Sequence, residues 1–280
     1  MSGTELLTHY DAALISLWTF WLFFFGLVFY LQREGRREGY PLVMEPTGRV
    51  DDPGAPFMPD PKTFKLPHGH GERTVPDYDG DPRTLNMEGT ARWPGSPVQP
   101  KGDPLKDGIG PAAWAERMDI PELSAEGDPK IIPMRIAEDF DIRSGDPDPR
   151  GMDVLSADQQ IVGTVSDVWI DRGEMMIRYL EVDLSDDGAT SNATDANGEE
   201  DSAAPKASGG GKVLVPMTLS RVGDYRNELS GWGGVVRVGA ITAEQFQHIP
   251  RTKSADQVTL REEDKIVGYI GGGHFFRKFG

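Results

Sequence analysis

AALISLWTFWLFFFGLVFYL, residues 12–31, is an apolar run without a single charged side chain. Twenty helical residues, at about 1.5 Å each, span about 30 Å, the thickness of the hydrocarbon layer of a bilayer. A core helix usually has a polar face, which this run lacks, and a signal peptide begins with basic residues. The preceding residues include Glu5 and Asp11 but no Lys or Arg. The run therefore predicts a retained transmembrane helix after a short leader at residues 1–11.

The charges on either side of this helix predict its orientation. Arg33, Arg36 and Arg37 follow it, whereas the only charged residues before it are acidic. Because Lys and Arg are retained on the cytoplasmic side of a membrane, we expect the leader outside and the rest of the chain inside. The chain would then be a single-pass membrane protein with a large cytoplasmic part.

The composition excludes some classes of partner and site. The 280-residue chain has a formal net charge of −16 and no cysteine. An acidic surface repels phosphate backbones, so nucleic acid is not an expected partner. Without cysteine the chain has no disulfide and no thiolate metal site.

Residues 32–104 are dense in Pro, Gly and Asp and have almost no periodic apolar pattern. Such a chain cannot form long helices or central strands. Large apolar residues nevertheless recur between the prolines: Phe57, Phe64, Leu66, Val75 and Tyr78. Disordered segments are poor in such residues. We therefore expect an extended segment that becomes ordered by covering a partner.

Residues 105–280 have a different sequence pattern, which predicts short strands separated by Gly-rich turns. Residues 160–171 alternate β-branched and small residues, and residues 175–184 form a second strand after a tight turn at Arg172 and Gly173. Several such strands predict a small closed or nearly closed β-barrel. The predicted fold class is a single transmembrane α-helix plus a mainly-β cytoplasmic domain, with an extended Pro/Gly-rich segment.

Two further features belong to this domain. Residues 185–211, SDDGATSNATDANGEEDSAAPKASGGG, are polar and acidic, with almost no apolar surface. They predict a flexible acidic insertion in the loop between two strands. Acidic residues at 262–264 favour the start of a short final helix, which the glycines at 271–273 would end.

Catalytic motifs are scarce in this sequence. It has no G-x-S-x-G, Walker A or H-E-x-x-H motif. His68 and His70 lie in a Pro/Gly loop, where two His are usually ordinary exposed residues, so we predict no metal site.

Two groups of carboxylates leave several interpretations open. Asp171 and Glu174 flank the predicted turn, and Glu122, Glu126 and Asp128 lie close together in the sequence. Clustered acids couple their titrations and can have raised pKa values, which suits proton relay. The alternative is that turns and surfaces are simply acidic in an acidic chain. A membrane-tethered hydrolase that uses Asp171 and Glu174 is a further alternative.

Eight sequence blocks, in order from the helix to the C-terminus, carry a family resemblance: FYLQREGRREGYPL (29–42), PKTFKLPHGHG (61–71), GDPLKDGIGPAAW (102–114), DIPEL (119–123), KIIPM (130–134), GTVSDVWIDRGEMMIRYLEVDL (163–184), VPM (215–217) and VTLREEDKIVGYIGGG (258–273). Together they resemble the H subunit of the purple-bacterial photosynthetic reaction centre. The resemblance implies that residues 105–280 form a barrel of the PRC type. A membrane-anchored PRC-barrel adaptor for another partner is the alternative, although unrelated barrels lack the helix-exit and Pro-rich blocks.

The resemblance implies a non-catalytic subunit that caps the cytoplasmic face of the L and M subunits, stabilises the complex and assists proton delivery to the secondary quinone. The complex would carry bacteriochlorophyll, bacteriopheophytin, ubiquinone, non-haem iron and, in some complexes, carotenoid, none held by ligands from this chain. Other implied partners are light-harvesting antenna subunits, a cytochrome subunit where the complex has one, and the anionic lipid cardiolipin. The location would be the bacterial inner (intracytoplasmic or chromatophore) membrane, with the leader in the periplasm.

The resemblance also implies roles for individual residues. The implied proton-transfer residues are Asp171, Glu174, Arg178, Glu122, Glu126 and Asp128. Well-studied members of the family carry two His where this chain has Glu126 and Asp128, so carboxylates would gather protons here.

The implied lipid-binding residues are Arg33, Arg36, Arg37 and Tyr40. They follow the predicted helix, where basic clusters attract anionic headgroups. The alternative is that these arginines only set the orientation of the helix.

Overall fold

The computed structural model describes residues 12–44, 49–52, 54–77, 83–93, 95–184, 211–227 and 231–276. The chain divides into two compact units, one of Met1–Arg83 with Gly89–Pro97 and the other of Thr84–Glu88 with Val98–Gly280. The predicted leader and residues 185–210 of the predicted acidic insertion lie outside the described residues.

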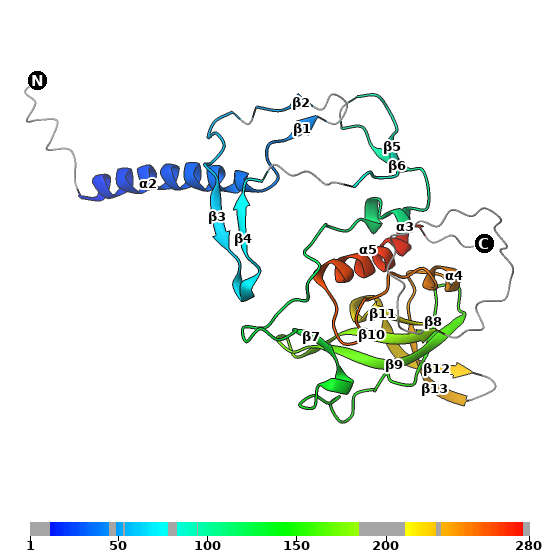
Figure 1. The fold of residues 1–280 in the computed structure, drawn as a ribbon. Coiled ribbons are helices and arrows are strands. Elements are labelled where there is room, and N and C mark those ends of the chain that lie inside the picture. The colour runs from blue at the N-terminus through cyan, green and yellow to red at the C-terminus, as the bar shows by residue number, and fades with distance from the viewer. Residues whose placement is uncertain are drawn as a thin grey trace, which may run out of the picture. The chain divides into compact units, whose positions relative to one another are not determined.

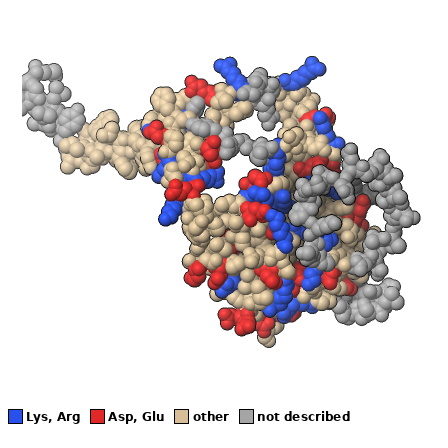
Figure 2. Space-filling view, in the orientation of Figure 1, with Lys and Arg blue, Asp and Glu red and all other residues tan. Residues whose placement is uncertain are grey.

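Helix α2 (Ala12–Glu34) is the apolar run of the first unit, and none of its residues is buried. The hydroxyls of Ser16 and Thr19 each donate to the backbone carbonyl four residues earlier, at 2.8 Å. These two polar groups are thus satisfied inside the helix, as a lipid environment requires. Figure 2 shows a surface without Lys, Arg, Asp or Glu along the length of this helix that carries the uncharged run 12–31. By length and composition the helix is a candidate membrane span, as predicted, while its orientation stays a prediction.

The Pro- and Gly-rich segment forms short two-stranded sheets. Strand β1 (Val43–Met44) pairs with β2 (Arg49–Val50), and β3 (Lys62–Lys65) pairs with β4 (Glu72–Val75), all antiparallel. The short 3₁₀ helices are η1 (Gly35–Arg37) and η2 (Pro67–Gly69), and a third pair of strands is β5 (Met87–Gly89) with β6 (Val98–Pro100). Several large apolar side chains of the first unit are exposed: Leu42, Val43, Val50, Phe57, Phe64 and Trp93. The segment therefore leaves apolar surface uncovered within its own unit.

A seven-stranded sheet forms the centre of the second unit (Figure 1). Its strands are β7 (Ile131–Pro133), β8 (Asp153–Leu155), β9 (Ile161–Asp171), β10 (Met176–Leu184), β11 (Lys212–Pro216), β12 (Arg221–Asn227) and β13 (Gly231–Arg237). Their order is β11-β10-β9-β8-β13-β12, with β7 pairing the end of β9, and β8 and β13 run parallel. The predicted mainly-β domain is confirmed. Within the described residues no ladder joins β11 to β12, so the sheet is open there.

Two predicted hairpins are confirmed in this sheet. Strands β9 and β10 pair antiparallel, as do β10 and β11, which flank the acidic insertion. The backbone N–H of Leu184 donates to the carbonyl of Gly211 at 3.1 Å, so the two ends of the insertion are held together. A Cβ on Gly163 would lie 2.1 Å from the carbonyl oxygen of Asp183. Only glycine allows β9 and β10 to approach so closely at this point.

Helix α5 (Leu260–Phe276) packs on β11 and against α3 (Pro104–Asp107) and η3 (Gly110–Ala112) (Figure 1). Thr259 and Glu262 cap its start: the N–H of Thr259 donates to Glu262 Oε2 at 2.9 Å, and the N–H of Glu262 donates to Thr259 Oγ1 at 3.2 Å. The remaining short helices are η4 (Met134–Ile136), η6 (Met217–Leu219) and α4 (Ala243–Phe246). The largest core side chains include Trp169, Leu180, Ile241, Phe246, Ile266 and Ile270.

The glycines at 271–273 do not end helix α5, contrary to the prediction. The helix continues through them to Phe276. A Cβ on Gly272 would lie 2.6 Å from the Cβ of Ala112, and a Cβ on Gly273 would lie 2.5 Å from the carbonyl oxygen of Ala240. Gly272 and Gly273 are present because the helix approaches neighbouring backbone closely, and not because the chain turns.

Candidate functional site

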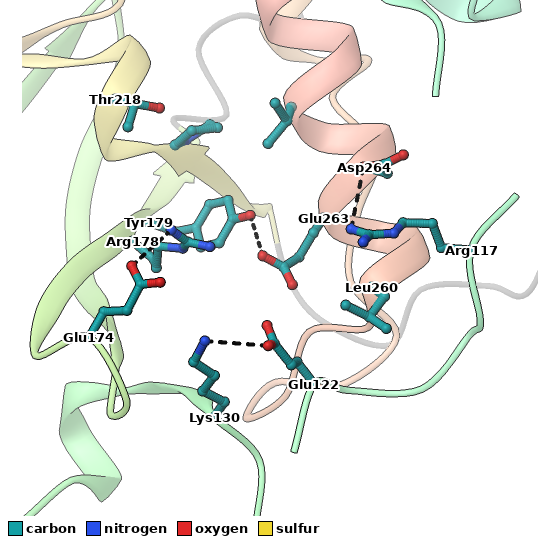
Figure 3. Close-up of a pocket in the computed structure, with 12 residues that line it drawn as sticks. Arg117, Glu122, Lys130, Glu174, Arg178, Tyr179, Thr218, Leu260, Glu263 and Asp264 are labelled. Carbon is teal, nitrogen blue, oxygen red and sulfur yellow. Dashed lines mark hydrogen bonds and ion pairs between the residues drawn. The ribbon is translucent and has the colours of Figure 1, made fainter. Parts of the chain in front are cut away.

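A cavity of about 620 Å³ lies in the second unit, beside the β9–β10 hairpin and helix α5 (Figure 3). Its lining includes seven charged residues: Arg117, Glu122, Lys130, Glu174, Arg178, Glu263 and Asp264. A cavity with so many polar groups is suited to hold water.

Asp171, at the end of β9, is fully buried and adjoins two of the cations that line the cavity. Its Oδ1 accepts hydrogen bonds from the backbone N–H groups of Gly173 and Glu174, at 2.9 and 3.0 Å, which stabilise the hairpin turn. Its Oδ2 has no hydrogen-bond partner among the described residues, but Lys130 Nζ lies 3.6 Å away and Arg178 Nε 3.9 Å away. Two cations therefore compensate this buried charge.

Three acids that line the cavity are paired with a base. The pairs are Glu122 with Lys130 at 3.3 Å, Glu174 with Arg178 at 3.5 Å and Asp264 with Arg117 at 3.8 Å. Burial lowers the pKa of Lys130, but the hydrogen bond to Glu122 and the charge of Asp171 outweigh it, so the pKa lies above its ordinary value. Lys130 is therefore a stable cation shared by two acids.

Glu263, on helix α5, contacts a hydroxyl, and none of the described residues forms an ion pair with it. The hydroxyl of Tyr179 donates to Glu263 Oε2 at 2.7 Å (Figure 3). Burial raises the pKa of Glu263, and the hydrogen bond from Tyr179 and the charge of Arg178 offset the rise only in part. Burial and the charge of Glu263 also raise the pKa of Tyr179. Glu263 thus takes up a proton more readily than an ordinary glutamate.

Two family models match most of the chain. Residues 4–136 match the model of the photosynthetic reaction centre, H-chain N-terminal region, and residues 141–229 match the PRC-barrel domain. The chain belongs to the family of reaction-centre H chains. Members of this family are non-enzymatic subunits that associate with the L and M subunits. This assignment sets aside the barrel adaptor for another partner and the tethered hydrolase.

In this H chain the structure brings four of the predicted proton-transfer residues together. Glu122, Glu174 and Arg178 line the cavity, and Asp171 lies within 4 Å of two lining cations. They converge because the β9–β10 hairpin carries three of them and the segment before β7 carries the fourth. Their role in proton transfer stays a prediction.

Glu126 and Asp128 are not part of the cavity lining of this H chain and lie on an exposed loop. A bridge between Leu123 and Pro129 closes this loop, and the N–H of Ser124 donates to the carbonyl of Asp128 at 2.8 Å. Hydrogen bonds from its own backbone and from the Ser124 hydroxyl lower the pKa of Glu126. This shift is opposite to the rise expected from clustering, because the hydrogen bonds outweigh the effect of burial on the pKa of Glu126.

Sequence reasoning missed Lys130, Tyr179 and Glu263. For Glu263 a signal existed: the spacing of Thr259 and Glu262 is that of a capping box, which assigns Glu262 to the helix start and leaves Glu263 free for another contact. Tyr179 had no comparable local signal, because Glu263 is 84 residues away from it. Lys130 also had none, because its contact with Glu122, eight residues earlier, depends on the loop between them.

The predicted lipid-binding residues make internal contacts in the first unit of the H chain. Arg36 and Arg37 donate to backbone carbonyls of residues 54–60, at distances of 2.6 to 3.0 Å. Arg36 also lies 5.7 Å from the ring centre of Tyr40, and Arg33 lies 3.4 Å from a carboxylate of the same segment. These contacts fasten the end of α2 to the following chain, and lipid binding stays a prediction.

A second polar cluster of the H chain surrounds Glu181, in strand β10. Its buried carboxylate accepts hydrogen bonds from Ser166 at 2.8 Å, Trp169 at 3.0 Å, Lys212 at 2.8 Å and Arg135 at 3.0 Å. Burial raises the pKa of Glu181, but these hydrogen bonds lower it to about 2. Glu181 is therefore ionised at neutral pH, and the cluster stabilises the fold.

Proposed function

We propose that this H chain covers the cytoplasmic side of the L and M subunits and delivers protons toward the secondary quinone through the cavity beside the β9–β10 hairpin. The observation that carries the proton role is the lining of this cavity, in which three acids are each paired with a base. A space of about 620 Å³ with such a lining has room for water. Protons move along chains of water and titratable groups.

Glu174, which lines the cavity, and Asp171, which adjoins it, have different roles in this proposal. The side chain of Glu174 is 51% exposed, so it is accessible to water, and Arg178 lies 3.5 Å from it. Asp171 is buried and holds Lys130 and Arg178 in place through its charge. A quinone that accepts two electrons also accepts two protons, which creates the demand that Glu174 helps to meet.

The covering role is supported by the apolar surface of the first unit. Phe57 is 67% exposed and Phe64 is 43% exposed, although both are large apolar side chains. Large apolar side chains that a folded unit leaves exposed are candidates for contact with a protein or a membrane. The L and M subunits are the partners that fit this surface in an H chain.

The Glu174→Gln variant of the assembled reaction centre tests the proton role. Glutamine keeps the size of the side chain but takes up no proton, so we expect the second, proton-coupled electron transfer to the secondary quinone to slow by roughly tenfold or more. Primary charge separation should not change. Flash-induced absorption changes measure both steps in one preparation.

Glu138→Gln is the matched control, because Glu138 is an exposed glutamate that does not line the cavity. An unaltered second electron transfer in Glu174→Gln would remove Glu174 from the route. Equal slowing in both variants would show a general effect of charge and would also count against the route.

A further inference from the structure

The acids around the cavity differ in one respect, which is whether a cation lies beside them. Glu122, Glu174 and Asp264 each have a basic partner within 4.0 Å. No Lys, Arg or His nitrogen of the described residues lies within 4.0 Å of the Glu263 carboxylate, whose polar contact is the Tyr179 hydroxyl at 2.7 Å. Glu263 is thus the acid of this lining whose negative charge is least compensated.

We propose that Glu263 is a further proton-binding residue of the H chain, which holds a proton in the cavity with Tyr179 as its hydrogen-bond partner. This inference rests on the proposed function, because the proton would be passed along the same route. A partly buried carboxylate without a cation favours its neutral form. A tyrosine hydroxyl donates to a carboxylate and accepts from a carboxylic acid, so the contact persists in both protonation states.

The other charged and titratable groups around Glu263 come from every element that lines the cavity: Asp264 from α5, Arg178 and Tyr179 from β10, Glu174 from the turn, and Arg117, Glu122 and Lys130 from the segment before β7. Burial is the largest influence on the pKa of Glu263 and raises it, and Glu122 raises it further. Tyr179, Arg178 and Arg117 lower it in part. The balance favours the neutral acid to a higher pH than for an ordinary glutamate.

The step assigned to Glu263 is a proton transfer alone. The O–H bond of the carboxylic acid breaks, the proton passes to a water in the cavity, and a proton from bulk water later restores the acid. No electron moves within this chain.

The test uses the assembled reaction centre with Glu263→Gln, Tyr179→Phe and, as control, the exposed Glu138→Gln. Light-induced infrared difference spectra report the carbonyl band of a protonated carboxylic acid. We expect this band to be lost in Glu263→Gln, shifted in Tyr179→Phe because its hydrogen bond is removed, and kept in Glu138→Gln. Proton uptake on quinone reduction, followed with a pH-indicator dye, should lose one pH-dependent component in Glu263→Gln only.

Failure of this inference can be told from failure of the proposed function. If Glu174→Gln slows the second electron transfer while Glu263→Gln leaves both the infrared band and the uptake curve unchanged, the route stands and the role of Glu263 is wrong. If Glu263→Gln removes the band but proton uptake is unchanged, Glu263 binds a proton outside the route, which also overturns the inference. Loss of both signals supports it.

Discussion

Glu181 and Glu263 both have partly or fully buried side chains in the second unit, yet their surroundings shift their pKa values in opposite directions. Glu181 receives four hydrogen bonds, two of them from cations. Glu263 receives one, from a neutral hydroxyl. Desolvation raises the pKa of both, so the number and charge of the donors decide the outcome. At the scale of single residues, Glu181 is suited to hold strands together and Glu263 to exchange a proton.

Glu181→Gln should remove a pH-dependent part of the stability. The pKa of Glu181 is lowered from 4.5 to about 2, so its ionisation stabilises the fold above about pH 4.5, and this contribution is lost as the pH falls from 4.5 toward 2. At 1.36 kcal/mol for each pKa unit, the contribution is up to about 3 kcal/mol. We expect Glu181→Gln to lower the free energy of unfolding at pH 7 and to flatten its decline in acid. Chemical denaturation followed by tryptophan fluorescence measures both.

Asp183→Asn is the control for this experiment, because Asp183 is an exposed acid on the same strand. It should keep the acid-dependent loss of stability. A Glu181→Gln variant with the same pH profile as the unaltered chain would contradict the role assigned to the cluster.

The cavity residues that a local sequence pattern brings together are those that lie close to one another in the chain. Asp171, Glu174 and Arg178 belong to one hairpin, whose turn chemistry places them together, and the sequence pattern predicted that hairpin. Tyr179 and Glu263 are 84 residues apart and meet only after helix α5 has packed on the sheet. No short-range pattern reports such a contact, and four of the seven charged lining residues, namely Arg117, Lys130, Glu263 and Asp264, were not predicted as site residues.

At the scale of elements, the glycines of α5 determine how closely it packs. A Cβ on Gly268 would lie 2.9 Å from the carbonyl oxygen of Ala113, and one on Gly272 would lie 2.6 Å from the Cβ of Ala112. Positions four apart lie on one helix face. That face is flat enough for η3 to lie directly against the helix backbone, and this contact supports the helix that carries Glu263.

Two neighbouring glycines of α5 should respond to alanine with opposite signs. Gly272→Ala should lower the free energy of unfolding by about 1–3 kcal/mol, because its Cβ has no space. Gly271→Ala should raise it by roughly 0.5–1 kcal/mol, because the nearest atom to its Cβ is 4.0 Å away and alanine favours helix. Thermal unfolding followed by circular dichroism compares the two. Equal changes in the free energy of unfolding for the two variants would show that close packing does not require a glycine at position 272.

Whether an element could be predicted from the sequence depends on whether its signal is local. The apolar helix and the β9–β10 hairpin follow from local patterns of hydrophobicity and turn residues, and both are confirmed. The end of α5 was predicted wrongly, since three successive glycines resemble a helix stop when Ala112 and Ala240 are not known to be neighbours. The open sheet also depends on pairing between distant strands.

At the scale of the whole molecule, the two units differ in how much of their apolar surface they bury themselves. The first unit has an apolar helix without buried residues and a segment with exposed apolar side chains. The second unit has its own core and its own cavity. The first unit thus leaves apolar surface exposed, as is expected of an H chain that contacts a membrane and the L and M subunits, whereas the second unit has a formed cavity.

Gentle detergent extraction of the tagged chain should bring the L and M subunits with it. The near-infrared spectrum of the product should show bacteriochlorophyll and bacteriopheophytin bands that bleach reversibly in light. Phe57→Asn should retain less pigment, because it removes an exposed apolar side chain, and asparagine tolerates the backbone φ of 64° at this position. A colourless product from pigmented cells would contradict the assembly.

The hydrogen bond between Leu184 and Gly211 has a consequence for protein engineering. It joins the ends of the acidic insertion where β10 and β11 are already paired, so the strands do not rely on the intervening residues for their register. Doubling the length of a flexible loop costs only about 0.6 kcal/mol. A fluorescent or affinity module placed between these two residues would therefore mark the H chain internally, leaving both of its termini unmodified.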